Sequence, residues 1–498
     1  QIMTDKFEFI GFDACLMGTV ETANILATYA DYMYGSQETE PGSGWDHTAI
    51  ADFLAENPKA DGLQLGKVVA DSFYEACRAA GEEDTATLTV VDLSGIDELV
   101  TSFNDFANDI YVSSEDSTAM SNIVRGILSA DNFGGNNDQE GYTNMVDLGG
   151  IISGCKNYSS SASAAASALS SCVVYNRNGS AHSGATGLSV YYPLSVRGSQ
   201  ELSVFSDVSI SPYYTTLVDK LRYASINDGD LAGYDDGDWF DYEGNWEHSY
   251  EYDYNEGSDE YYYEQDNDIW EYWSYAESYE PTGGDSPYIS FASQPGVNSD
   301  GIYNFTLDSR GLDYTSVVSG YVLQKLDGHY LVIGETYDVN ADWDNGYFED
   351  LFDGAWLSLP DGQNLSLYPV GGSDGYALYT SPVELNGERT YLRIIQSPYG
   401  VVVDGTTDGI DESGAAPRGT VKLKDGDVIV PLYDCTDIDE SYYGDEYIVS
   451  GDISIDYDYI DEGEYYYSFC IYDLFGDYLM TDYVSFSVDE NGDIWFRP

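Results

Sequence analysis

The chain has 498 residues and carries 18 Lys and Arg against 89 Asp and Glu, a net charge of −71 at pH 7. This charge excludes most nucleic-acid binders, because neutralising phosphates requires clustered cations, and it disfavours docking on an anionic membrane surface. No run of 18 apolar residues predicts a membrane-spanning helix. The length predicts two or three domains. So large an excess of acid is typical of a solvated surface, and it also attracts cationic partners.

Residues 1–226 alternate short apolar strands with longer amphipathic stretches, which predicts a layered α/β domain. The expected strands are Phe7–Phe12, Thr85–Val91, Met145–Leu148, Val173–Asn176 and Gly187–Tyr192. The expected helices are Leu16–Tyr34, Ile96–Ile110 and an Ala/Ser-rich stretch around 158–171. Because strands and helices follow one another, we expect mainly parallel pairing with helices on both faces of the sheet.

Residues 227–284 differ sharply in composition. Asp, Glu, Tyr and Trp dominate there, and no Lys or Arg occurs between Asp228 and Glu280. Uncompensated like charge favours an extended, poorly packed chain. We therefore expect an acidic linker; the alternative is a segment that docks on a basic patch of a partner chain.

Residues 285–498 consist of short apolar segments separated by Gly, Asp and Asn. Two-residue turn signals occur at 327–328, 361–362 and 386–387. This pattern predicts an antiparallel β-sandwich region of one or two subdomains. The expected strands include Tyr288–Phe291, Val317–Leu326, Tyr330–Glu335, Tyr391–Gln396, Val421–Lys424 and Tyr466–Asp473.

The segment Phe7–Met17, FEFIGFDACLM, is the most informative for chemistry. It places Cys15 just after a predicted buried strand, where open α/β sheets carry their sites. The expected helix that follows would favour a thiolate through its N-terminal partial charge, whereas the neighbouring Asp13 would oppose it. Two other interpretations stay open from the residues alone: Cys15 as an inert buried thiol, and Asp13 as the N-cap of the helix.

The octapeptide Ile10–Met17, IGFDACLM, resembles the nucleophile motif of the clostripain family of cysteine peptidases, which share a clan with caspases, gingipains and legumain. Two further segments agree, ETEPGSGW at 38–45 and GATGLSVYYP at 184–193. In the β region, FDGAW at 352–356 and DGQ at 361–363 also resemble the family. The resemblance implies a caspase-like α/β sandwich, with a mostly parallel sheet and flanking helices, in residues 1–226. Residues 227–284 would then be the linker, and 285–498 the accessory β-sandwich region.

The resemblance also implies a function for two residues. Cys15 would be the nucleophile of an endopeptidase that cleaves after Arg or Lys, and Asp13 would line the S1 pocket and pair with the basic P1 side chain. Some relatives carry a second acid where this chain has Ser43; Glu38, Glu40 or Asp46 are candidates to compensate. Backbone N–H groups, including that of Cys15, would hold the oxyanion.

The catalytic His of the family precedes the Cys, yet the fourteen residues before Cys15 contain no His. The resemblance therefore implies that the general base lies on a smaller companion chain, separated by self-cleavage before Gln1. We expect a secreted or cell-surface bacterial enzyme acting on polypeptides. The alternatives are a non-catalytic binding or adhesion protein on the same fold, and a peptidase with another P1 preference.

The four His in this chain are not expected to serve Cys15. His47 follows the nucleophile, the wrong order for the family; His182 lies in a loop and is expected to face solvent. His248 falls in the acidic linker and His329 in a hairpin turn. So few His and no CxxC pair make a structural zinc site unexpected.

Two further questions stay open from the sequence. The cysteine pairs 155–172 and 435–470 are spaced so that either could form a disulfide. No cofactor is required for the expected chemistry, but calcium is a candidate. Asp338, Asn340, Asp342 and Glu349 match positions of a calcium-binding loop, although Trp343 stands where that loop needs Gly; a solvated acidic turn is the alternative.

Overall fold

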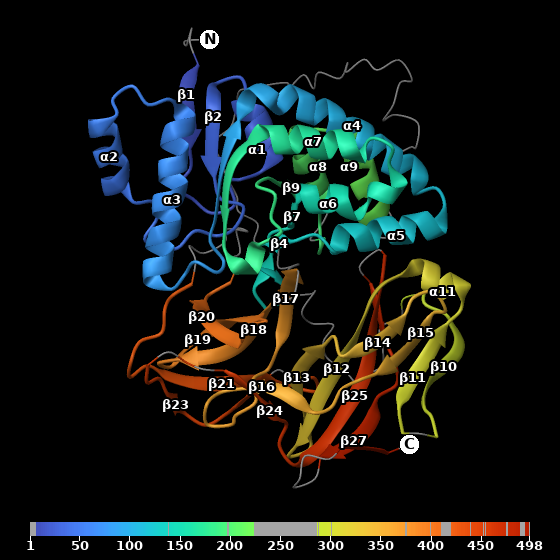
Figure 1. The fold of residues 1–498 in the computed structure, drawn as a ribbon. Helices are drawn as coiled ribbons and strands as arrows, with labels where there is room; N and C mark the ends of the chain where they lie inside the picture. Colours follow the sequence, from blue (N-terminus) through green and yellow to red (C-terminus); the bar gives the residue numbers. More distant parts are fainter. Residues whose placement is uncertain are drawn as a thin grey trace, which may run out of the picture.

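A computed structural model describes residues 6–137, 139–196, 199–223, 286, 288–299, 301–373, 376–398, 400–409, 420–438, 440–451, 453, 455–474, 477–488 and 494–497. The predicted acidic linker, with His248, lies outside these residues. Figure 1 shows two halves stacked on each other: a helix-rich half formed by residues 6–223 and a strand-rich half formed by the described residues from 286 onward. Among the described residues, no helix is long and apolar enough to span a bilayer.

The helix-rich half is built on a four-stranded mixed sheet in the order β1 (Phe7–Gly11), β2 (Ala30–Gly35), β3 (Thr87–Asp92) and β8 (Val173–Asn178). Strand β1 is parallel to β2, whereas the β2–β3 and β3–β8 pairs are antiparallel. The prediction of a mostly parallel sheet is therefore wrong for the described strands. One α-helix lies between β1 and β2, whereas two lie between β2 and β3, and four, with several short strands, lie between β3 and β8. Because β2–β3 and β3–β8 are antiparallel, each of these two longer connections returns the chain to the end of the sheet at which it left.

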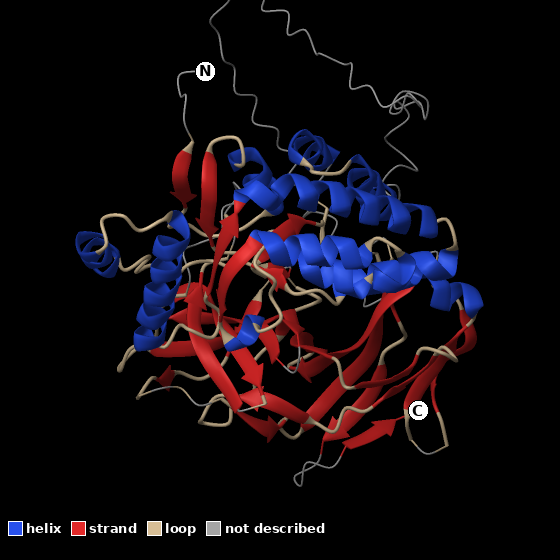
Figure 2. Cartoon of the chain, turned by 45° about the horizontal axis from the view of Figure 1, so that its top comes forward, coloured by secondary structure: helices blue, strands red, loops and turns tan. Residues whose placement is uncertain are grey.

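Helices cover both faces of this sheet, as expected (Figure 2). Helix α3 packs on one face through Leu65, Val69 and Phe73, while α1, α4 and α7 contribute to the larger core on the other face. The helices are α1 (Val20–Leu26), α2 (His47–Glu56), α3 (Gly62–Ala80), α4 (Ile96–Ser113), α5 (Ser117–Leu128), α6 (Leu148–Gly154), α7 (Ala162–Cys172), α8 (Ser199–Val208) and α9 (Pro212–Val218). Small strands β4 (Asn132–Phe133), β7 (Met145–Asp147) and β9 (Ser189–Tyr191) form a separate sheet, and β5 (Asn136–Asn137) pairs with β6 (Gly141–Tyr142).

The helix predicted over Leu16–Tyr34 is wrong in extent. Leu16 has a left-handed φ of 61°, which interrupts any helix, and α1 begins only after the Thr19 N-cap. The second part of the prediction is strand β2, whose alternating Tyr and Met side chains suit a pleated strand. The other elements predicted in this half are present with ends shifted by a few residues. The prediction that the strand before Cys15 is buried is wrong, because β1 lies at the edge of the described sheet and its residues are exposed or half-buried.

The strand-rich half confirms the predicted antiparallel β region: every pairing between its described strands is antiparallel. The dipeptides 327–328 and 386–387 both have positive φ, as tight hairpin turns require. Of the predicted strands, Val421–Lys424 is wrong, because only Val421 forms an isolated bridge, and Tyr288–Phe291 is displaced, because the strand begins at Phe291.

Four sheets make up this half. The first holds β10 (Phe291–Val297), β11 (Tyr303–Leu307), β15 (Tyr347–Asp350) and β14 (Val339–Asp342). The second holds β13 (His329–Thr336), β12 (Thr315–Leu326), β25 (Gly463–Asp473), β26 (Tyr478–Met480), β27 (Val484–Val488) and β28 (Ile494–Arg497). The third holds β20 (Gly400–Thr407), β19 (Glu388–Ser397), β18 (Tyr376–Leu385), β17 (Tyr368–Ser373), β21 (Val428–Asp434), β22 (Ser441–Tyr443) and β23 (Tyr447–Ile448). The fourth pairs β16 (Ala355–Ser358) with β24 (Asp456–Tyr459), and one helix, α11 (Ser309–Tyr314), lies against α5.

Candidate active site

Cys15 lies in the turn that follows β1 and is half-buried. Its Sγ accepts the backbone N–H of Glu40 at 3.3 Å and lies 4.0 Å from the Glu40 carbonyl oxygen. A backbone donor aimed at the sulfur stabilises negative charge there. The expected helix N-terminus is absent at this point, because α1 begins at Val20. The segment containing Glu40, rather than a helix, therefore holds the thiol in place.

Asp13 lies on the same turn and faces the segment that leads into α2. Its Oδ1 accepts the backbone N–H of Trp45 at 3.3 Å, and its Oδ2 lies 3.2 Å from Nε2 of His47. The Asp13 side chain is 28% exposed. A Cβ on Gly44, whose φ is 62°, would lie 2.5 Å from Asp13 Oδ1, so only glycine fits there. The N-cap interpretation of Asp13 is wrong, because Thr19 caps α1.

Ser43 and the three acids considered as a substitute for a second acid there occupy different environments. Ser43 is exposed and uncharged. Glu40 is 1% exposed and accepts the indole N–H of Trp45 at 3.3 Å. Asp46 accepts the first N–H groups of α2 as its N-cap. Glu38 turns into the interior, so Asp13 is the partly exposed carboxylate beside Cys15.

Glu38 and His182 form a buried ion pair, which contradicts the prediction that His182 faces solvent. His182 is 0% exposed; its Nδ1 lies 3.0 Å from Asp131 Oδ2 and its Nε2 lies 3.2 Å from Glu38 Oε2. Burial alone would lower the pKa of His182, but the charges and hydrogen bonds of Asp131 and Glu38 raise it to about 10. Burial would raise the pKa of Glu38, but His182, with a contribution from Arg393, lowers it to about 2.

The remaining histidines have other partners. His47 is 74% exposed and contacts Asp13, and His329 Nδ1 lies 2.9 Å from Asp437. The three described histidines thus lie against acids. The general base for Cys15 is not assigned to any of them.

All six cysteines are free thiols, so neither disulfide considered from the sequence is formed. Burial raises the pKa of Cys77 and Cys155 to about 12 and that of Cys172 to about 11. Cys470 is buried as well, and its pKa is also raised. Cys435 is only half-buried. Four of the thiols are therefore enclosed in cores.

The candidate calcium loop, residues 338–349, forms the β-hairpin of β14 and β15. Asn340 donates to Glu349, and Asn345 donates to Asp342, within that hairpin. In the described part of the chain, no three His, Cys, Asp or Glu side chains are grouped to hold a metal ion.

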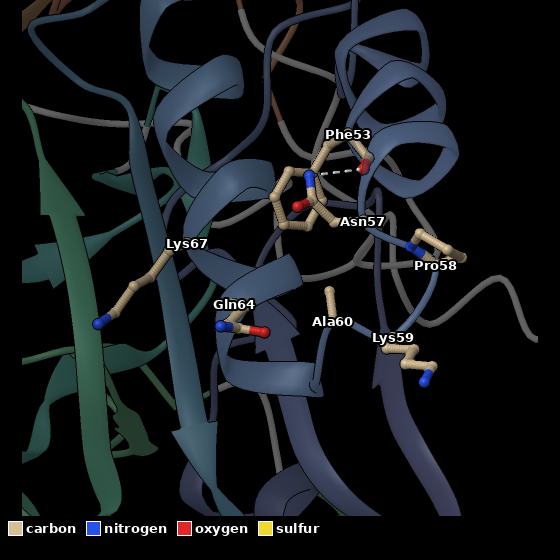
Figure 3. A pocket seen from close by; sticks show the side chains of 7 residues that line it. All are labelled: Phe53, Asn57, Pro58, Lys59, Ala60, Gln64 and Lys67. Carbon is tan, nitrogen blue, oxygen red and sulfur yellow. Dashed lines mark hydrogen bonds between the residues drawn. The ribbon is translucent and has the colours of Figure 1, made fainter.

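A pocket of about 570 Å³ lies between α2 and α3 (Figure 3), and neither Cys15 nor Asp13 lines it. Phe53 and Asn57 line it at the end of α2, whereas His47, at the opposite end of that helix, contacts Asp13. The Lys67 side chain points away from the other lining residues in this view. The pocket is therefore separate from the candidate active site.

The turn after β1 thus places a half-buried thiol, Cys15, and a partly exposed carboxylate, Asp13, together at the end of a sheet strand. The model of the clostripain family, Peptidase_C11, matches residues 2–273, more than half of the chain. The chain belongs to the clostripain family of cysteine peptidases. The family resemblance predicted from the sequence is thus confirmed.

Solved structures show weaker likeness. A clostripain from Bacteroides thetaiotaomicron ATCC 29148 in complex with the peptide inhibitor BTN-VLTK-AOMK is 19% identical, with a TM-score of 0.31, over 43% of this chain and 87% of that one. A B. fragilis cysteine protease is 18% identical, with a TM-score of 0.29, over 43% and 88%. A secreted C11 cysteine protease from B. thetaiotaomicron is 20% identical, with a TM-score of 0.32, over 43% and 60%. No curated protein matches the chain. The family assignment rests on the family model alone.

Proposed function

We propose that this chain is the nucleophile-bearing chain of an endopeptidase that cleaves peptide bonds after Arg or Lys. The observation that carries the proposal is the placement of Cys15 and Asp13 on one turn, both partly accessible and both fastened to the loop that runs from Glu38 to His47. A thiol and an anionic anchor so close together suit a substrate that presents a basic side chain next to the scissile carbonyl.

In the proposed reaction the Cys15 thiolate attacks the carbonyl carbon, and a C–S bond forms as the C–N bond breaks. The imidazolium that holds the thiol proton gives it to the leaving amine, and water then hydrolyses the thioester. The N–H of Cys15 is one proposed oxyanion donor, and a second would come from beside the catalytic His.

Asp13 supplies the counter-charge for the P1 side chain. An uncompensated buried cation costs several kcal/mol, so a single carboxylate in this position selects Arg and Lys over neutral residues. Because Ser43 adds no charge opposite it, discrimination between the two cations depends on geometry; a bidentate pair would favour Arg.

The general base is proposed to lie on a smaller companion chain, produced by self-cleavage and retained. Strand β1 is at the edge of its sheet, and its Phe7 and Phe9 are 52% and 37% exposed. Ile25 and Tyr29 of the adjoining α1 segment are also half-exposed. An exposed apolar edge strand is a template for pairing with another strand, and a strand added there would end beside the turn of Cys15.

The proposal includes secretion or display at a bacterial cell surface, where polypeptide substrates are met. Calcium stays in the proposal as a bound ion whose ligands are unassigned. Activity retained after treatment with a calcium chelator would remove it from the proposal.

The nucleophile is tested by Cys15→Ala, measured on the isolated protein with any associated chain. We expect hydrolysis of peptides with P1 Arg or Lys to fall about 10³-fold or more, with the precursor left uncut. A biotinylated ketone inhibitor with P1 Lys should label Cys15, as located by mass spectrometry. The matched control is Cys435→Ala, a half-buried thiol of the β region, which should keep full activity. Unchanged hydrolysis in Cys15→Ala would indicate a binding protein instead.

The specificity pocket is tested by Asp13→Asn, which keeps the shape but removes the charge. We expect kcat/KM for basic P1 residues to fall about 100-fold, because the P1 cation loses its partner. Asp31→Asn, an exposed carboxylate on β2, is the control and should change little. Intact mass measurement of the native protein tests the companion: a single polypeptide in an active preparation would contradict it.

A further inference from the structure

A buried chain of charged groups connects the β region to the segment that holds Cys15. Its members are Arg393 on β19, Glu140 beside β6, and Glu38 in the active-site segment, with 5%, 2% and 2% of their surfaces exposed. No motif of the sequence predicted it. The only sign was a cation in the middle of the apolar strand YLRIIQ, where an unpaired charge would be costly.

Arg393 crosses from one half of the molecule to the other. Its Nε donates to both Glu140 carboxylate oxygens, at 3.0 and 3.2 Å, and its Nη2 donates to the Gly134 carbonyl oxygen at 2.8 Å. Thr380 of β18 donates to the same carboxylate. The guanidinium thus spans Glu140 and the backbone of Gly134 at once, a planar arrangement that lysine cannot reproduce.

Gly134 links Arg393 to Glu38. Its backbone N–H donates to both carboxylate oxygens of Glu38, at 3.0 and 3.1 Å. Gly134 has a φ of 77°, and a Cβ there would lie 2.4 Å from Thr143 Cγ2, so the backbone is held in a conformation that only glycine accepts. Arg393 also contributes, after His182, to the lowered pKa of Glu38.

Glu38 in turn holds the segment around the nucleophile. Its backbone oxygen accepts the N–H of Leu16, the residue after Cys15, at 3.2 Å. Two residues further on, the Glu40 N–H donates to Cys15 Sγ. The side chain of Glu38 is thus fixed by the interior and by the β region, while its backbone fixes the turn of the thiol.

We propose that Arg393 is a positioning residue for the peptidase site: through Glu140, Gly134 and Glu38 it sets the placement of the segment that holds Cys15 and Asp13. The inference rests on the proposed peptidase function. It assigns the β region a part in positioning the site, because Arg393 and Thr380 of that region hold the Glu140 carboxylate. A contiguous set of contacts is a structural argument for coupling, and coupling itself has to be measured.

The test compares Arg393→Met with Arg389→Met in the complete protein. Arg389 lies on the same strand but is 47% exposed and pairs with Asp434 at the surface, so its loss removes a cation without touching the site. We expect Arg393→Met to lower kcat at least tenfold and to speed amide hydrogen exchange in residues 36–45, with thermal unfolding still above the assay temperature. Arg389→Met should change neither quantity.

Arg393→Lys keeps the charge but not the two-way contact, so it should recover hydrogen-exchange protection and kcat only in part. Full recovery by Lys, or Arg393→Met with unchanged exchange in residues 36–45, would overturn the inference. Hydrogen exchange separates this inference from the proposed function: an inactive wild-type protein would refute the peptidase, whereas the exchange result would still decide the role of Arg393.

Discussion

Two histidine–carboxylate pairs lie at opposite ends of one short segment, and they differ in almost every physical respect. At one end His47 and Asp13 are 3.2 Å apart with 74% and 28% of their side chains exposed. At the other end His182 and Glu38 are also 3.2 Å apart, with only 1% and 2% exposed. The same chemical pair at the same distance therefore occurs once in solvent and once in the core.

This difference in exposure indicates that the buried pair, His182 and Glu38, is the structural one. Water screens the exposed pair, which is worth less than about 1 kcal/mol and can be opened by a competing cation. No water can take the place of either partner in the buried pair. Asp131 contacts His182 and the Gly134 N–H donates to Glu38, so removing one partner leaves the other charge buried and uncompensated. The proposed binding and release of a basic side chain requires an exposed pair that can be opened, whereas the structure beneath the site requires a buried pair that stays closed.

The largest expected effect comes from His182→Ala. Removing the imidazole leaves Glu38 and Asp131 buried without their cation, which should cost about 3–5 kcal/mol of unfolding free energy. Chemical denaturation monitored by circular dichroism measures the loss. His329→Ala, at a partly exposed pair, is the control and should cost less than about 1 kcal/mol. Equal losses of unfolding free energy in the two variants would contradict the distinction between the buried pair and the exposed pairs.

The pH dependence of stability tests the same comparison between the buried and the exposed pair. The pKa of His182 is raised from 6.5 to about 10, so its contribution is complete below pH 6.5 and is lost as pH rises through 10. The pKa of Glu38 is lowered from 4.5 to about 2, so its contribution is complete above pH 4.5 and is lost as pH falls through 2. The stability difference between wild type and His182→Ala should thus be greatest at pH 4.5–6.5 and shrink by several kcal/mol towards pH 10. A difference that stays flat to pH 10 would contradict the charged pair.

Gly44→Ala should have an intermediate effect at the exposed end. A methyl group there meets Asp13 at 2.5 Å in a left-handed conformation, so we expect about 1–2 kcal/mol of strain and a KM for basic substrates several-fold higher. Gly81→Ala has a similar φ of 70° but open space around the added carbon. It should therefore lose stability without any change in KM, and a KM change in Gly81→Ala would undermine the assignment.

His47→Ala should have the smallest effect. It removes the imidazole that would compete with a P1 cation for Asp13 in the proposed function, so KM for substrates with P1 Lys or Arg should fall by about fivefold at most, the range of an exposed pair. Unfolding free energy should be unchanged within experimental error. A large rise in KM would mean instead that His47 contacts the substrate.

Local signals in the sequence predicted local structure well. The Asp-Gly and Asn-Gly dipeptides predicted two hairpins because only such residues accept successive positive φ angles. The apolar run before Cys15 predicted β1 and the position of the thiol after it. Periodicity over Leu16–Tyr34 failed, however, because spacings of three and four also arise when a short helix is followed by a strand.

Long-range features escaped prediction for a different reason. The direction of β3 and β8 depends on the path of the connections before them, which the strand sequences do not encode. His182 reads as a loop residue because its partners, Glu38 and Asp131, are distant in sequence. Only the folded chain shows that Glu38, an acid in the segment that contacts Cys15, is paired with the buried His182.

The distribution of thiols makes the folded protein a selective target for simple alkylating reagents. Four cysteines are buried, where a thiolate rarely forms, so a small haloacetamide should react only with the two half-buried thiols, Cys15 and Cys435. In a Cys435→Ala background, the amount of rapidly incorporated label would therefore give the fraction of molecules whose Cys15 is accessible. Slower labelling of the four buried cysteines would give the rate at which the protein unfolds around each of them.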